Sequence, residues 1–269
     1  AQTMPKADIG DAEIYYEVHG DGPPLMLVPG LGGGGGFWAK QVPAFAKHFR
    51  VVIHDHRGAG QSTHSRIRYS VEQMASDAVK LMDKLGIDTA HYVGHSTGGA
   101  MGQVIAQDHP ERLRSLVLSA TWAGQDPYFR RCFETRKEVL LKLGIESYGR
   151  ASMLVLAPPW WIAANDAHVA EMSKALAVNN PPVEVMASRI DAIMNFDRRA
   201  GLGRIKAPTL VIVARDDAVT PLHLSDEIAG GIAGATKIVL DRGGHFVPII
   251  FPDEYNATVL AFLREQSRG

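Results

Sequence analysis

The chain has 269 residues, which is close to the upper limit of what one hydrophobic core supports, so we expect one large domain or one domain with an insertion. Apolar residues make up 46% and charged residues 21%, a balance typical of globular proteins that argues against disorder. The formal net charge of −1 leaves no overall field to attract nucleic acid or an anionic membrane. We therefore expect a small-molecule partner, and neither nucleic acid nor membrane.

Cysteine content and the N-terminal pattern bear on the compartment. The single Cys132 cannot form an internal disulfide, and no secretion-signal pattern precedes the first domain-like pattern. No apolar run reaches the roughly 18 residues of a spanning helix. We predict a cytoplasmic protein. The number of copies in the assembly stays open, with a homodimer as one alternative.

Six short apolar runs are continuous rather than alternating, which is typical of strands covered on both faces. They are residues 25–28, 51–53, 92–93, 116–118, 210–213 and 238–240. Helical patterns fall between them, most clearly over residues 71–85, where Ser70 and Gln73 have the spacing of a capping box. Strands alternating with helices predict an α/β fold with a parallel sheet, whose ligands bind beyond the carboxyl ends of the strands.

The alternation is interrupted once, by a long and mostly helical segment with apolar content of its own. A connection of this length is better interpreted as an inserted cap than as a loop. We therefore expect a core formed by residues 4–121 and 206–267, and a helical cap formed by residues 122–205.

Residues 94–98, Gly-His-Ser-Thr-Gly, match the pattern G-x-S-x-G. The pattern follows an apolar strand and precedes a helical run, which is the setting of a nucleophile elbow with a strained serine. Ser96 is therefore the predicted nucleophile. The alternative is a glycine-rich helix entry with an incidental serine.

A serine hydroxyl needs a base, and the base needs a group that orients it. His245 follows the last apolar strand and is the predicted base. Asp217 is the predicted acid, because the turn after it would direct it toward His245. Asp216 remains an alternative, since register at a strand end cannot be derived from sequence.

An oxyanion formed at Ser96 needs two backbone donors. Thr97, directly after the nucleophile, supplies one N–H, and the glycine loop after residues 25–28 supplies the other. Pro29 has no N–H, so Leu31 is predicted. The alternative is that the glycines form only a flexible loop.

No metal or cofactor is expected. His54 and His56 have strand spacing, but two ligands without a third make a weak metal site. His95 lies inside the elbow and is interpreted as structural.

The order of these motifs resembles that of the α/β-hydrolase superfamily, over essentially the whole chain. Residues 55–62 are also similar to a D-x-R-G-x-G-x-S turn common there, and the layout looks most like the small enol-lactonase and aminoacrylate-hydrolase group, the latter suggested by residues 130–136. The resemblance implies a mostly parallel eight-stranded sheet with helices on both faces, a lid, and a triad of Ser96, Asp217 and His245. Many members have His-Gly where this chain has Pro29-Gly30. The serine disfavours haloalkane dehalogenases and epoxide hydrolases, which use an aspartate there.

Bulky apolar side chains near the elbow or in the cap are candidates for substrate binding, although most side chains of this kind are more often plain core. They are Phe37, Trp122, Met153, Trp160, Trp161 and Met194. They favour an apolar acyl or lactone substrate. A carboxylate on the substrate would need a buried cation, with Arg130, Arg131 and Arg189 as candidates, but each of these is interpreted first as a solvated helix charge.

The leading hypothesis is hydrolysis of a carboxylic ester or lactone through an acyl-enzyme, including acyl-homoserine lactones or an enol-lactone. A second hypothesis is cleavage of an amide, carbamate or C–C bond by the same triad. A third belongs to another class: a ligand-sensing receptor that turns over slowly.

Overall fold

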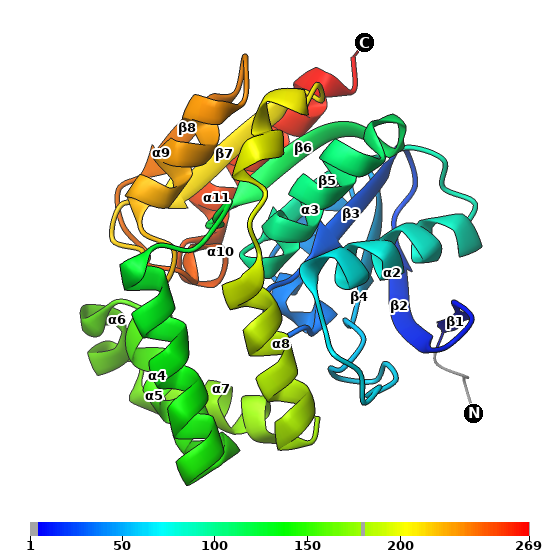
Figure 1. Ribbon diagram of the computed structural model, residues 1–269. Coiled ribbons are helices and arrows are strands. Elements are labelled where there is room, and N and C mark those ends of the chain that lie inside the picture. The colour runs from blue at the N-terminus through cyan, green and yellow to red at the C-terminus, as the bar shows by residue number, and fades with distance from the viewer. Residues whose placement is uncertain (1–4, 179–180, 269) are drawn as a thin grey trace.

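The computed structural model of the protein describes residues 5–178 and 181–268. An eight-stranded sheet crosses the molecule in the order β1-β2-β4-β3-β5-β6-β7-β8 (Figure 1). The pairs β1–β2 and β2–β4 are antiparallel and the other five are parallel, which confirms the predicted mostly parallel sheet. The strands are β1 Lys6–Asp8, β2 Glu13–His19, β3 Pro24–Val28, β4 Arg50–His54, β5 Ala90–His95, β6 Leu113–Ser119, β7 Thr209–Ala214 and β8 Thr236–Leu240.

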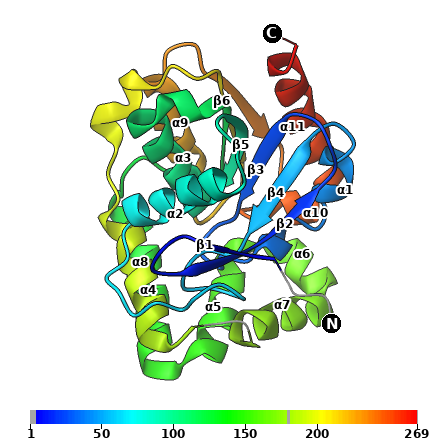
Figure 2. The ribbon, with the colours of Figure 1, turned by 90° about the vertical axis from the view of Figure 1, so that its right-hand side faces the viewer.

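Helices cover both faces of this sheet. One face carries α2 (Val71–Lys84), α3 (Thr97–Asp108) and α9 (Leu222–Gly231), and the other carries α1 (Val42–Phe45), α10 (Val247–Ile250) and α11 (Pro252–Gln266) (Figures 1 and 2). In β3, Met26 and Val28 join one buried apolar cluster, while Leu25 and Leu27 join the other. Because every position of such a strand is buried, its sequence is continuously apolar.

The N-terminus of α2 follows the prediction in part. Oγ of Ser70 accepts a hydrogen bond from the Gln73 N–H at 3.0 Å, so Ser70 is the N-cap. The reciprocal half of the predicted capping box is wrong, because Oε1 of Gln73, which would accept from the Ser70 N–H, has no hydrogen-bond partner within the described residues. The amide group of Gln73 instead lies along the helix, where its Nε2 donates to the buried carboxylate of Asp77.

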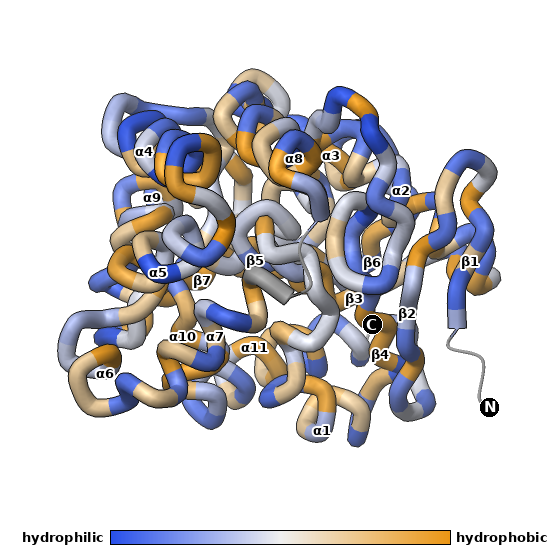
Figure 3. The backbone as a smooth tube through the Cα atoms, turned by 90° about the horizontal axis from the view of Figure 1, so that it is seen from below, coloured by the Kyte–Doolittle hydropathy of each residue, from blue (hydrophilic) through white to orange (hydrophobic). Residues whose placement is uncertain are grey.

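The segment between β6 and β7 is mostly helical. It contains α4 (Pro127–Leu143), α5 (Ile145–Leu156), α6 (Pro159–Ala164), α7 (Asp166–Val178), α8 (Val183–Asn195) and the 3₁₀ helix Arg199–Arg204. We call residues 122–205 the cap segment. Its helices α4, α5 and α8 each carry hydrophobic and hydrophilic residues, as expected for helices with one buried side (Figure 3). Met4, where the predicted core begins, lies outside the described residues.

Among residues 5–178 and 181–268, no helix is both long and apolar enough to cross a bilayer.

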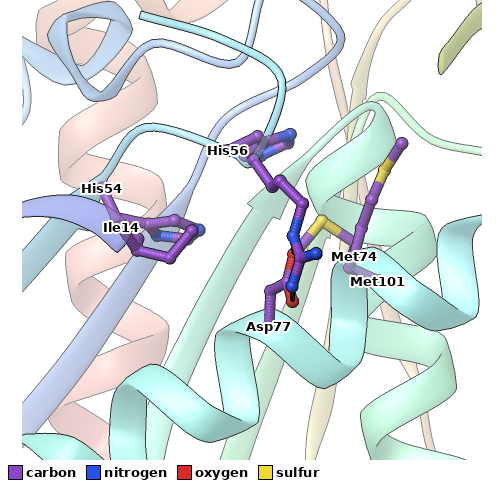
Figure 4. Close-up of a pocket in the computed structure, with 7 residues that line it drawn as sticks. Ile14, His54, His56, Met74, Asp77 and Met101 are labelled. Atoms are coloured by element: carbon purple, nitrogen blue, oxygen red, sulfur yellow. Dashed lines mark hydrogen bonds and ion pairs between the residues drawn. The ribbon is translucent and has the colours of Figure 1, made fainter. Parts of the chain in front are cut away.

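A buried ion pair joins α2 to the turn after β4. The Arg57 guanidinium donates to both carboxylate oxygens of Asp77, at 3.0 and 2.8 Å, and also reaches Asp11. The Asp77 side chain is 8% exposed, whereas that of Asp11 is 69% exposed. Asp77 lies beside a small pocket that His54 and His56 also line (Figure 4).

The substitution Asp77→Asn should lower the free energy of unfolding by roughly 3 kcal/mol, because it leaves the Arg57 charge buried with a weakened partner. Asp11→Asn is the matched control, and its loss should be much smaller because water screens the exposed carboxylate. Urea unfolding followed by circular dichroism measures both. Equal losses in the two variants would contradict this account.

Candidate active site

Ser96 lies at a sharp turn between β5 and α3. Its backbone has φ 55° and ψ −116°, a region that residues with a side chain rarely adopt. Its N–H donates to the Ser119 carbonyl at 2.8 Å, and its own carbonyl accepts from Oγ1 of Thr121 at 2.7 Å. These bonds to β6 and to the residues after it hold the strained turn. Within the described residues, Oγ of Ser96 makes no hydrogen bond.

The glycines on either side of Ser96 are needed for close backbone contacts. A Cβ at Gly94 would lie 2.2 Å from the Gly98 carbonyl oxygen, and a Cβ at Gly98 would lie 2.1 Å from the carbonyl oxygen of Val28. Both distances are far below van der Waals contact. The G-x-S-x-G pattern is therefore a steric requirement for packing the start of α3 against β5 and the end of β3.

His245 and Asp217 meet at the carboxyl ends of β7 and β8. Nδ1 of His245 lies 2.8 Å from Oδ2 of Asp217, and both side chains are buried. Oδ1 of Asp217 accepts from the N–H groups of Val219 and Thr220, at 2.9 and 2.8 Å. Oγ1 of Thr220 donates to Oδ2 at 3.1 Å and lies 3.2 Å from Nδ1 of His245. Sequence reasoning gave Thr220 no role, because only the fold brings its hydroxyl between the two.

Asp216 faces a different partner. Its Oδ1 accepts a hydrogen bond from the Gly244 N–H at 2.7 Å, one residue before His245. The two neighbouring aspartates thus contact different groups. Asp217 contacts the imidazole of His245, and Asp216 contacts the backbone of the loop that carries His245.

The ring of His95 packs against the ring of His245. Its ring centroid is 4.9 Å from that of His245 and 4.9 Å from that of Phe37, which stacks on it. Nδ1 of His95 bonds Oγ of Ser119 at 2.8 Å, and the Tyr255 hydroxyl donates to the same Oγ at 2.8 Å. Burial, and secondarily the charge of His245, lowers the pKa of His95 well below its usual range. His95 is therefore a neutral packing group.

The loop after β3 lies directly beside Ser96. A Cβ built on Gly30 would be 3.2 Å from Cβ and 3.7 Å from Oγ of Ser96. Within residues 5–178 and 181–268, neither the Leu31 N–H nor the Thr97 N–H donates a hydrogen bond. Two backbone donors next to a serine hydroxyl are the arrangement that an oxyanion requires.

The six candidate substrate residues have different surroundings. Trp122 is fully buried between Phe129 and Phe196, with an unpartnered Nε1, and Met153 is also buried. Phe37 is half-buried against His95, and Trp161 and Met194 are partly buried against the core cluster. Trp160 is 42% exposed, and the Arg242 guanidinium lies 4.6 Å above its ring. Their roles stay predictions.

The interpretation of Arg189 as a solvated charge is wrong. Arg130 and Arg131 are exposed as expected, but Arg189 is 1% exposed, because the face of α8 that carries it packs against the core. Sequence reasoning also missed Arg136 of α4, which is buried and bonds Oγ of Ser152 at 3.0 Å and the Tyr148 hydroxyl at 3.2 Å. Periodicity alone does not show which helix face meets the sheet.

His54 and His56 stack, with ring centroids 5.6 Å apart. Burial lowers the pKa of His54 to about 4, and burial together with the Arg189 charge lowers that of His56 well below its usual range. No cluster of three or more His, Cys, Asp or Glu side chains suited to a metal occurs in the described part of the chain.

Comparison with known proteins agrees with this fold. Residues 23–143 match the model of the alpha/beta hydrolase fold family. The chain is similar to a putative carbamate hydrolase, RutD, of Azorhizobium caulinodans, with 42% identity over 97% of this chain and 99% of that protein.

Two solved structures show the same architecture. The enol-lactonase from Burkholderia xenovorans LB400 matches with a TM-score of 0.90 and 30% identity, over 97% of this chain and 100% of that one. Est816, described as an N-acyl homoserine lactone degrading enzyme, matches with a TM-score of 0.83 and 27% identity, over 96% and 100% of the two chains. The predicted resemblance is confirmed, and the chain belongs to the α/β-hydrolase superfamily.

Proposed function

We propose that this hydrolase cleaves its substrate through an acyl-enzyme formed on Ser96. The observation that carries the proposal is the strained Ser96 turn together with the buried His245–Asp217 pair at 2.8 Å. In the proposed reaction, Oγ of Ser96 attacks the carbonyl carbon while Nε2 of His245 takes the proton. Asp217 holds Nδ1, which keeps the imidazole in the tautomer that can accept at Nε2.

The tetrahedral intermediate carries a negative oxygen, which the N–H groups of Leu31 and Thr97 would stabilise. Collapse of the intermediate expels the amine or alcohol, which takes the proton from His245. Water then attacks the acyl-enzyme with His245 again as the base, which releases the acid and restores Ser96. No metal or cofactor enters this scheme.

For the bond that is cleaved, the carbamate or amide class is favoured. The support comes from full-length similarity to proteins named putative carbamate hydrolases, at 42% and 41% identity. An ester or lactone is the second candidate, favoured by the enol-lactonase structure at 30% identity. A carbamate nitrogen is a poor leaving group, so protonation by His245 matters more for it than for an ester oxygen.

The cap segment would supply specificity. We propose residues 122–205 as the cap on a core of residues 4–121 and 206–267. Phe37 is favoured as a substrate contact because it packs on His95 and, edge-on, on Phe246, next to the base. Met153, Trp122, Trp161, Met194 and Trp160 remain proposed contacts from the cap segment.

Ser96→Ala should abolish labelling by a fluorophosphonate probe and lower kcat by roughly a millionfold, because the nucleophile is lost. Intact-mass spectrometry measures labelling, and labelling that persists in the variant would overturn the nucleophile.

The class of bond that is cleaved is tested by measuring kcat/KM for a carbamate, an amide, an ester and a lactone of matched structure. Each kcat/KM is divided by the rate constant of uncatalysed hydrolysis, so that intrinsic reactivity cancels. The carbamate is expected to give the largest ratio. A larger ratio for the ester or lactone would favour the second candidate, and ligand-dependent partner binding without turnover would indicate a receptor.

Asp217→Asn should lower kcat by about 10⁴, because an amide stabilises the wrong imidazole tautomer. Asp216→Asn is the matched neighbour and should cost about tenfold or less, because the amide oxygen can still accept from the Gly244 N–H and only the charge is lost. Steady-state kinetics of both variants distinguish the two aspartates, and the reverse ranking would assign the acid to Asp216.

A further inference from the structure

Arg189 reaches from α8 of the cap segment into the loop beside Ser96. Its Nη1 donates to the Leu31 carbonyl at 2.7 Å, and its Nη2 donates to Nδ1 of His56 at 2.9 Å. The side chain is 1% exposed. Both ends of the guanidinium therefore bind protein acceptors, which leaves Arg189 poorly placed to bind a substrate carboxylate.

The charge on Arg189 is unusual because it is not neutralised nearby. Within the described residues, Arg189 forms no ion pair, and its Nε is buried without a partner. Burial lowers its pKa to about 10, which still leaves it protonated at neutral pH. A buried cation without an acid is costly, because no opposite charge compensates the loss of its hydration. Stability alone does not explain this side chain.

Two glycines make room for Arg189. A Cβ on Gly33 would lie 3.0 Å from Nη2, and a Cβ on Gly58 would lie 3.0 Å from Cδ of Arg189. Both glycines have positive φ, of 73° and 83°. Ala59 lies closer still to Gly33, and Tyr69 to Gly58. Both glycines are therefore needed where the glycine loop, the turn after β4 and Arg189 pack together.

The loop that Arg189 binds is a turn with the Leu31 N–H on its outside. The Gly33 N–H donates to the Gly30 carbonyl at 2.9 Å, and the His56 N–H donates to the Gly33 carbonyl at 2.8 Å. The Gly30 carbonyl and the Leu31 N–H belong to one planar peptide and point in opposite directions. Holding that carbonyl inward directs the N–H outward. Arg189 holds the next carbonyl, that of Leu31, which belongs to the following peptide. The peptides on both sides of the Leu31 Cα are therefore anchored, and Leu31 cannot rotate its N–H away.

We propose that Arg189 is a positioning residue that holds the Leu31 N–H in place for the oxyanion. The oxyanion hole then depends on the position of α8 against the core. The inference rests on the proposed acyl-enzyme chemistry. Arg189 would stabilise the transition state and not the bound substrate, because the oxyanion does not exist in the bound substrate.

Arg189→Met keeps most of the stem and removes the charge and donors. We expect the acylation rate constant and kcat to fall by about 10- to 100-fold, less than for complete loss of an oxyanion donor, while KM changes by less than about threefold. The affinity for a boronic acid, which mimics the tetrahedral intermediate, should fall by the same factor as kcat. The affinity for the reaction product should not change.

Asp191→Asn is the matched control on α8. It removes the negative charge that pairs with Lys137 of α4, at 2.7 Å, without touching the glycine loop, and it should leave kcat unchanged. Arg189→Lys keeps the charge but lacks the fork that reaches both acceptors, so its kcat should lie between those of wild type and Arg189→Met. If Arg189→Met does not fold, as judged by circular dichroism, Arg189→Lys carries the test alone.

Three results would overturn the inference: an unchanged kcat in folded Arg189→Met, a loss confined to KM, or an equal loss in Asp191→Asn. The first would show that the loop needs no support, the second that Arg189 binds substrate, and the third that cap packing in general matters. Fluorophosphonate labelling of Ser96 in these variants separates this failure from failure of the nucleophile, because labelled Ser96 keeps the proposed function intact.

Discussion

The close contact between Gly98 and the Val28 carbonyl is the constraint on which the candidate site depends. It brings the start of α3 against the end of β3 with no room for a side chain, 2.1 Å from a hypothetical Cβ. Ser96 must then adopt its strained conformation, and the Gly30–Leu31 loop, which continues from β3, must pass beside its hydroxyl. One backbone contact therefore sets both the nucleophile and one predicted oxyanion donor.

The Asp217 carboxylate and the glycine loop of the candidate site are held by different kinds of contact. Asp217 is held by neighbours in the chain and the loop by a distant residue, and this difference decides how far sequence could predict each of them. Asp217 takes its hydrogen bonds from Val219 and Thr220, so a turn after a strand end was enough to favour it. Its choice over Asp216 nevertheless depends on strand-end register, which no local pattern contains. The glycine loop takes its support from Arg189, 158 positions away along the chain, and an arginine on an amphipathic helix gives no sign of such a partner.

The parallel part of the fold could be predicted because strands β3 to β7 are almost entirely buried and therefore continuously apolar, while the edge strand β8 still ends in the apolar run of residues 238–240. β1 and β2 were not predicted from the residues themselves. β2 has the exposed or half-exposed Glu13, Glu17 and His19, and it pairs antiparallel near the edge of the sheet, so it lacks a continuous apolar run. The number of eight strands came only from the family resemblance. Local patterns predict strands that keep a continuous apolar run, as β8 does at one edge, and miss strands such as β2, whose water-facing positions carry polar side chains.

The hydroxyl of Tyr255 on α11 supports Oγ of Ser119, a contact that spans 136 positions of the chain. During synthesis the β5–β6 pair emerges long before α11, so the packing beneath His95 and His245 stays incomplete until late in translation. A nascent chain with its elbow already formed would therefore lack both its base and the support below that base. The candidate serine, its proposed base and the tyrosine that supports their packing can therefore come together only when almost the whole domain is available to fold.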